Sequence, residues 1–322
     1  MTATAASDSP RGPARGAPRA HQGLRTGPAA ALLVACFAAS VGVQVARDRV
    51  APRSTIDASI LYVQSPAAMR RIVLGYDALA ADIYWIRAIQ HFGGTRRLED
   101  ASARTYHLLA PLLDLTTGLD PLFNIAYRFG AIFLSEPPPG GPGKPELAIR
   151  LLERGLEARP DNWRYMQDIG FVHYWWRRDY RAAAEWFNRG ADVPGAPWWL
   201  RSVAATTLAQ GGDRRASRQL WQTLAESADN DWLRRDAARR LQQLDALDAR
   251  ELLQRVVRQF IDAGGQKPYS WEALVRARRL RAVPRDPSGT VFYLGPWSGD
   301  VDVADDSSLR PLPTDPRADV MR

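Results

Sequence analysis

The side chains with the clearest potential for recognition chemistry are aromatic, and they crowd one part of the chain. Eleven aromatic residues fall between Trp163 and Trp199. Aromatic side chains bury large apolar areas and often dominate the energetics of interfaces. This density indicates a protein that binds an apolar or aromatic group, although roughly half of these residues must also pack in its own core.

Residues at a spacing typical of catalysis or metal binding do not occur in the sequence. Cys36 is the only cysteine, which excludes a Cys-based zinc site. The acidic run from Asp300 to Asp306 lacks the glycine and the glutamate of an EF-hand loop. There is no P-loop, dinucleotide fingerprint or nucleophile motif, so we expect no enzymatic activity, no cofactor and no metal. The histidines are not at metal-ligand spacing, and they are His21, His91, His107 and His173.

The elements that must position the aromatic side chains follow from a repeated triplet of small and bulky residues. Ala183, Phe187 and Gly190 reappear 34 residues later as Ser217, Trp221 and Leu224, and Ala148, Leu152 and Gly155 lie 35 residues earlier. A period near 34 is typical of stacked helical hairpins, because two helices cross closely only where a side chain is small. Such repeats bind other molecules on their stacked faces.

Helical periodicity and turn residues predict five hairpins within residues 74–265. Gly93 and Gly94 are expected to end the first helix, and the proline-rich residues 135–143 are expected to form a surface loop. After residue 265 we predict a helix at 271–280 and strands at 290–294 and 300–303. The predicted helix pairs are 74–92 with 96–115, 123–134 with 145–158, 163–177 with 180–191, 198–210 with 214–228, and an irregular pair within 231–261.

The hairpins resemble tetratricopeptide (TPR) repeats. Gly130, Gly170 and Ala205 occupy the small position of the first helix, and Pro160 closes one hairpin. The stretches 74–94, 111–134 and 167–187 are similar to a family of bacterial membrane-anchored TPR proteins of uncharacterised function. The resemblance implies an all-α fold, a TPR-like α-solenoid of helical hairpins with an N-terminal transmembrane helix and a small C-terminal cap of one helix and a β-hairpin.

The TPR register assigns side chains to the inner, concave side of the array. A groove lined by them would suit an apolar or aromatic peptide, with Arg164 and Gln167 holding polar backbone or a carboxylate. The chaperone-type clamp for a terminal acid is not expected, because that clamp uses Lys and Asn where this chain has Gln167 and Phe171. The assigned partner-binding residues are Tyr127, Arg164, Gln167, Phe171, Tyr174, Trp175, Trp199 and Ser202.

Residues 28–46 carry no charge over 19 positions, which is just long enough for a helix to cross a bilayer. We interpret them as an uncleaved signal anchor, with the repeat domain in the periplasm. Two alternatives stay open, a buried soluble helix and a lipoprotein signal, since residues 33–36 match a lipobox ending at Cys36. The net charge of +8 comes from arginines scattered among acids, so we expect no nucleic-acid partner.

These observations predict a membrane-anchored scaffold or adaptor of the bacterial inner membrane that binds a partner protein or peptide in an envelope assembly. The alternative is a lipoprotein or pilotin-like accessory subunit of a secretion or pilus system, since Asp286–Tyr293 resembles a segment of type II secretion pseudopilins. The predicted order is a disordered tail (1–27), the anchor (28–46), a linker (47–73), the repeat domain (74–265), the cap (266–313) and a second disordered tail (314–322).

Overall fold

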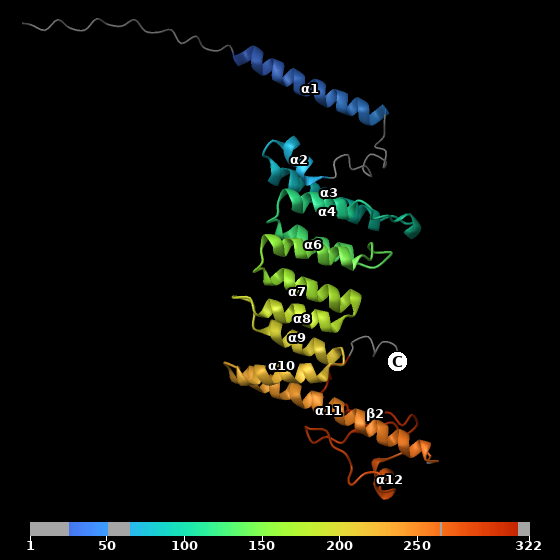
Figure 1. Ribbon diagram of the computed structural model, residues 1–322. Coiled ribbons are helices and arrows are strands. Elements are labelled where there is room, and N and C mark those ends of the chain that lie inside the picture. Colours follow the sequence, from blue (N-terminus) through green and yellow to red (C-terminus); the bar gives the residue numbers. More distant parts are fainter. Residues whose placement is uncertain (1–25, 51–64, 265, 315–322) are drawn as a thin grey trace, which may run out of the picture. The chain divides into compact units, whose positions relative to one another are not determined.

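The computed structural model describes residues 26–50, 65–264 and 266–314, which belong to two separate units, 1–60 and 61–322. Residues 1–25 and 315–322 of the predicted tails, and residues 51–64 of the predicted linker, lie outside the described residues. Within the described ranges the chain forms twelve α-helices and one two-stranded sheet (Figure 1). The expected dominance of helix, with a small β-hairpin near the carboxyl end, is therefore confirmed.

The first unit contains one described helix, α1 (Thr26–Val50). Its side chains are described from residue 31 to residue 46, and all of them are exposed. No helix among the described residues combines the length and the apolar character that crossing a membrane requires. The side chains of residues 28–30, where the predicted anchor begins, lie outside the described ones. The anchor stays a prediction.

The second unit is a succession of helices that each pack on their neighbours in the chain (Figure 1). The chain reverses at each turn, so alternate helices run in the same direction. The elements are α2 (Pro66–Val73), α3 (Asp77–Arg96), the 3-10 turn η2 (Ala101–Ala103), α4 (Leu109–Leu119), α5 (Asn124–Ser135), α6 (Pro145–Ala158), α7 (Trp163–Val172), the π-helical turn η3 (His173–Arg177), α8 (Tyr180–Ala191), α9 (Trp199–Gln210), α10 (Arg214–Glu226), α11 (Asp231–Asp262), α12 (Trp271–Arg276), β1 (Tyr293–Leu294) and β2 (Val301–Asp302).

The three central hairpins agree with the prediction to within two residues at each end when the π-helical turn η3 is counted with α7. Side chains at the helix starts accept backbone hydrogen bonds, as Asp179 does from the Ala182 N–H (3.0 Å) and Asp213 from the Ala216 N–H (3.1 Å). The repeated small residues lie where the helices cross. A Cβ atom at Gly170 would stand 2.4 Å from the Phe187 ring, so only glycine allows this contact between α7 and α8.

The first predicted hairpin is wrong in its boundaries. The helix α3 runs through Gly93 and Gly94 to Arg96, because neither glycine adopts a left-handed conformation that would end it. The helix expected over 96–115 begins only at Leu109 and continues through Gly118. Pro66 fills the space that a side chain at Gly118 would need, so this glycine serves packing and not a turn. Pro66 begins α2, a helix within the predicted linker.

The predicted fifth pair of helices is one continuous helix, α11, of 32 residues. No glycine or proline interrupts residues 231–262, so no residue in this segment breaks the helical hydrogen bonding. The Asn230 side chain starts α11 by accepting the Leu233 N–H (2.8 Å). The first half of α11 packs on α10, and its second half packs on the C-terminal cap.

The cap holds its own small apolar core, in which Trp271, Phe292 and Val303 are buried. The predicted helix is shorter than expected and ends at Arg276, before Arg278 turns into the left-handed region. The strands pair antiparallel, with Tyr293 opposite Asp302, and each is shorter than predicted.

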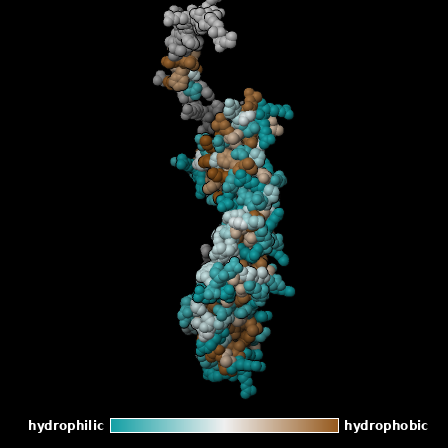
Figure 2. All heavy atoms as spheres, turned by 90° about the vertical axis from the view of Figure 1, so that its left-hand side faces the viewer, coloured by the Kyte–Doolittle hydropathy of each residue, from teal (hydrophilic) through white to brown (hydrophobic). Residues whose placement is uncertain are grey.

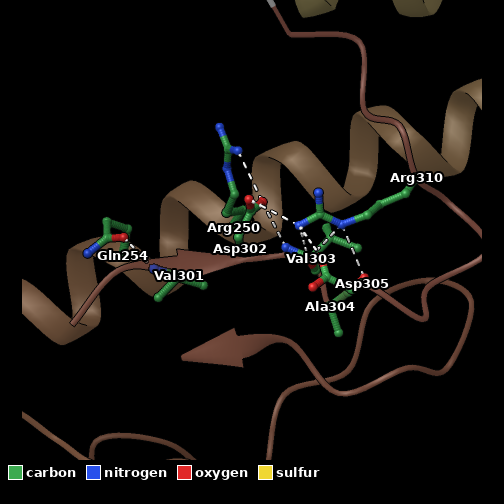
Figure 3. A network of polar contacts seen from close by, with 8 residues as sticks. All are labelled: Arg250, Gln254, Val301, Asp302, Val303, Ala304, Asp305 and Arg310. Atoms are coloured by element: carbon green, nitrogen blue, oxygen red, sulfur yellow. Dashed lines mark hydrogen bonds and ion pairs between the residues drawn. The ribbon is translucent and has the colours of Figure 1, made fainter. Parts of the chain in front are cut away.

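A polar network joins the cap to α11 (Figure 3). The Gln254 side chain accepts the Val301 N–H at 2.8 Å and donates to the Gly299 carbonyl at 3.0 Å. Asp302 lies between Arg250 (3.3 Å) and Arg310 (3.4 Å). One helix therefore carries both the last helical hairpin and the cap.

Candidate functional site

A pocket of about 400 Å³ opens between the π-helical turn and the helices α7, α9 and α11. Its wall is mostly aromatic, and we call it the aromatic pocket. It is lined by Phe171, Tyr174, Trp175, Phe187, Trp198, Trp199, Ser202, Val203, Thr206, Thr207, Gln210, Trp221, Trp232, Asp236 and Arg240.

The π-helical turn supplies one wall of the pocket. It carries Tyr174 and Trp175, whose ring centroids are 5.0 Å apart in an edge-to-face arrangement. Phe171, one turn earlier, packs edge-to-face on Phe187 at 5.2 Å. These contacts hold the aromatic wall against α8, since edge-to-face pairs add stability beyond the area they bury.

The opposite side of the pocket has a buried floor and an exposed rim. Trp221 of α10 is only 2% exposed and forms the floor. Trp198 and Trp232 form a rim pair with ring centroids 5.3 Å apart, and they are 57% and 55% exposed. A ligand entering the pocket would therefore cover aromatic surface that now meets solvent.

A few polar groups face this apolar wall. The Tyr174 hydroxyl donates to Gln210 Oε1 at 2.9 Å. Arg240 donates from Nη1 to Gln243 Oε1 at 3.2 Å, and its Nε lies 3.6 Å from Asp236 Oδ1. Ser202 Oγ is buried and has no hydrogen-bond partner among the described residues. A mostly apolar cavity with a small number of placed polar groups is typical of a binding site.

Five of the eight predicted partner-binding residues line the aromatic pocket, and two lie elsewhere on α7. Arg164 places its guanidinium carbon 4.4 Å from the Trp163 ring centroid, and Gln167 does not line the pocket either. The charged residues at the pocket come instead from α11, at Asp236 and Arg240. The five predicted residues that the structure brings together are Phe171, Tyr174, Trp175, Trp199 and Ser202.

The predicted position of Tyr127 on the inner surface is wrong. Its side chain is 1% exposed and packs against Tyr165, with ring centroids 5.3 Å apart. Burial raises the pKa of Tyr127, and it raises the pKa of Tyr165 to about 12. The buried positions of α5 (126, 127, 130, 131) match those of α7 (165, 166, 169, 170) at an offset of 39, not 40. The prediction aligned Gly130 with Gly170, which is one residue out of register. One residue is about 100° around a helix, so the side chains of α5 were assigned to the wrong face.

The residues of the pocket that the sequence analysis missed lie on α8, α9, α10 and α11 and at Trp198, just before α9. A signal existed for one of them, since α7 and α9 start with tryptophan, at Trp163 and Trp199, and Trp232 stands one residue after the start of α11. Because two short helices were expected within 231–261, Trp232 was not recognised as the equivalent of Trp163 and Trp199. Trp221 was recognised only as the bulky member of its triplet.

A second notable surface lies on α3 and α5, where aliphatic side chains and one phenylalanine are about half exposed. We call it the apolar face. Figure 2 shows apolar side chains gathered over the amino-terminal helices of this unit. With the corrected register, Ile125, Phe129 and Ile132 of α5 correspond to Arg164, Asp168 and Phe171 of α7. The face consists of Leu79, Ile83, Ile86, Ile89, Leu122, Ile125, Phe129 and Ile132.

Other polar clusters are accounted for by structural roles. The hollow of about 550 Å³ beside Arg250, Asp302 and Arg310 is part of the ion-pair network of the cap. The described residues contain no cluster of histidine, cysteine and acidic side chains that could hold a metal ion. The aromatic pocket is therefore the better candidate for a ligand.

Comparison with known proteins found no matching family model, no matching curated protein and no matching solved structure.

Proposed function

We propose that this chain is a TPR-like scaffold whose aromatic pocket binds an apolar or aromatic segment of a partner protein. The observation that carries the proposal is the pocket itself, a cavity of about 400 Å³ with mostly aromatic walls. Large, rigid aromatic side chains supply contact area at a low cost in conformational entropy, which is why they anchor many interfaces.

The polar groups of the pocket favour a peptide over a ligand that is wholly apolar. The Gln210 side-chain amide can exchange a hydrogen bond with peptide backbone, and the Arg240 guanidinium can donate another. Because Asp236 lies beside Arg240, the pocket is not a simple anion site. The preferred segment therefore places an apolar or aromatic side chain in the pocket and its backbone at the polar end.

The proposal includes attachment to the bacterial inner membrane, with the repeat region in the periplasm. Its support is the uncharged character of residues 31–46 and the exposure of their side chains along α1. An exposed apolar helix is costly in water and stable in lipid. Resistance of the full chain to alkaline extraction from membranes tests this part, and release by alkali would overturn it.

A substitution that fills the pocket with a bulky side chain tests the binding function directly. A photo-crosslinking residue in place of Trp198, on the exposed rim of the pocket, should capture a partner in native membranes. Thr206→Trp places a bulky ring inside the pocket and should lower the crosslinked yield about tenfold or more, equivalent to about 1.4 kcal/mol. Trp297→Ala, at an exposed position outside the pocket, is the control and should leave the yield unchanged. An unchanged yield with Thr206→Trp, at retained helicity, would refute the pocket assignment.

The lipoprotein or pilotin-like alternative depends on Cys36, which is exposed on α1. Lipidation would require cleavage just before this residue and a diacylglycerol on Sγ. The intact mass of the protein from membranes decides between the two forms, because the anchor form retains residues 1–35 and carries no acyl group.

A further inference from the structure

We infer that the apolar face of α3 and α5 is the site at which a second copy of this chain binds. This inference goes beyond the proposed partner binding, because it concerns other residues on other helices. It follows from the exposure of the face, its area and the spacing of its side chains.

The exposure of α5 is unlike that of an ordinary surface helix. Its only exposed side chains are Ile125, Phe129 and Ile132, at 52%, 50% and 46%, so no polar residue of α5 is fully turned to solvent. A surface helix normally directs charged or polar residues away from the core. This composition indicates that another apolar surface covers α5 when the protein functions.

The area of the face fits a protein interface. Each of its eight residues exposes about half of a surface of about 200 Å², which gives roughly 800 Å² in total. A stable interface of standard size buries about 800 Å² per partner, while the largest apolar patch of a typical monomer is about 300–600 Å². Full coverage of the face by a second copy would therefore bury about the area of a standard interface.

The spacing of the side chains makes the face complementary to itself. Leu79, Ile83 and Ile86 of α3 follow a spacing of four and then three residues, and Ile125, Phe129 and Ile132 of α5 repeat it. Two stripes of this kind interlock as helices do in coiled coils. Because α3 and α5 run in the same direction, a two-fold axis parallel to them lays α3 of each copy along α5 of the other.

The same stripes fit a lipid surface poorly. Membrane-surface helices surround their apolar stripe with lysine and arginine, which bind anionic headgroups. Here the stripe of α3 is bordered by the exposed Asp82 and by a single cation, Arg87, which lies over the Tyr84 ring at 5.6 Å. The nearest cation on α5, Arg128, is engaged by Asp168 at 2.6 Å. A symmetric partner, the commonest kind in soluble oligomers, accounts for the face more directly.

Sedimentation of the purified full chain in density-matched detergent tests the inference. The wild type should have the mass of two chains at micromolar concentration. Ile83→Asp and Ile125→Asp, one on each helix, should each raise the dissociation constant about 100-fold or more. Leu252→Asp is the matched control, because Leu252 is 55% exposed on α11, outside the face. It should leave the dimer intact.

Two results would overturn the inference. One is a wild-type chain that stays monomeric over the whole concentration range. The other is a dimer that neither face variant weakens, or that Leu252→Asp weakens equally, since association would then come from another segment. Circular dichroism of each variant confirms that helicity is retained, so that a change of mass reports on association. Failure here leaves the pocket test untouched, because Thr206 is not part of the face.

Discussion

The apolar face and the aromatic pocket are two versions of one surface, the side that the first helices of the hairpins leave uncovered. On α3 and α5 this side carries exposed aliphatic residues of similar size together with Phe129. From α7 to α11 it carries aromatic residues, and a cavity opens. The boundary is the Arg128–Asp168 ion pair, whose two bonds of 2.6 Å and 3.1 Å join α5 to α7. Burial raises the pKa of the Asp168 carboxyl, and this effect is larger than the lowering caused by the Arg128 guanidinium.

The difference teaches that side-chain size decides whether a repeated backbone forms a surface or a cavity. On α9 the small residues Ser202, Val203 and Thr206 face the large rings of the π-helical turn and of α11, and space remains between them. On α5 the isoleucines and Phe129 project at regular spacing. The apolar face can bind a partner through the hydrophobic effect, which does not depend on direction. The pocket also has polar groups, whose hydrogen bonds would fix the orientation of a ligand.

The largest expected effect is on the free energy of unfolding, because the two regions differ in how deeply their aromatic side chains are buried. Trp221→Ala removes a ring that is 2% exposed on the pocket floor and should lower the free energy of unfolding by about 3–5 kcal/mol. Phe129→Ala on the apolar face should change it by about 0.5 kcal/mol or less, because that ring is half exposed. Urea unfolding at a protein concentration low enough to keep the chain monomeric measures both. Equal losses would mean that the two regions do not differ as described.

The second prediction compares glycines in the helices of the two regions. Gly170→Ala drives a methyl group into the Phe187 ring and should destabilise the protein by about 1–3 kcal/mol. Gly93→Ala in α3 meets no atom within 4 Å and should stabilise it by up to about 1 kcal/mol, since glycine weakens a helix interior. Thermal unfolding of the two variants gives the signs. A gain at Gly170 would show that the hairpin below the pocket is looser than the contact indicates.

The smallest effect is on pH dependence, with one histidine in each region. Burial lowers the pKa of His91, and the charge of His107 lowers it further. Burial and Arg177 lower the pKa of His173, but Asp179, 4.0 Å away, opposes them. A histidine with a lowered folded pKa takes up its proton more readily when unfolded, so stability falls as the pH drops below 6.5 toward the folded value.

Replacement of each histidine should therefore flatten the loss of stability between about pH 7.5 and about pH 5.5. His91→Gln should flatten it more than His173→Gln, because only His173 has a compensating acid close by. Unfolding midpoints at the two pH values provide the measurement. The reverse order would show that Asp179 does not reach His173 in solution.

The sequence was sufficient for the central hairpins and for five of the fifteen residues that line the pocket. The triplets around Phe187 and Trp221 mark real helix crossings, and the register from Gly170 brought Phe171, Tyr174 and Trp175 together. That register depends on a contact, the one between Gly170 and Phe187, which fixes the rotation of α7. Where such a contact governs the helix, local spacing is informative.

The rest depended on contacts that local spacing does not encode. Gly130 packs against Leu113 and Leu151 of two different helices, so it did not define the rotation of α5, and Tyr127 was misplaced. The helix expected over 96–115 extends through Gly118, because this glycine accommodates Pro66, which is distant in sequence. The length of α11 was missed because its apolar positions change as it passes from α10 to the cap.

The π-helical turn His173–Arg177 sets the direction in which the aromatic wall of the pocket faces. Gly170 and Phe187 are 17 residues apart, while the corresponding Ala205 and Trp221 are 16 apart, and the extra residue falls between 170 and 180, where the turn lies. A π-helical turn closes on hydrogen bonds one residue longer than those of an α-helix, so it accommodates this residue within the helix. Deletion of one residue between Gly170 and Tyr174 would therefore turn the Tyr174 and Trp175 rings by about 100° relative to α7 and remove the wall.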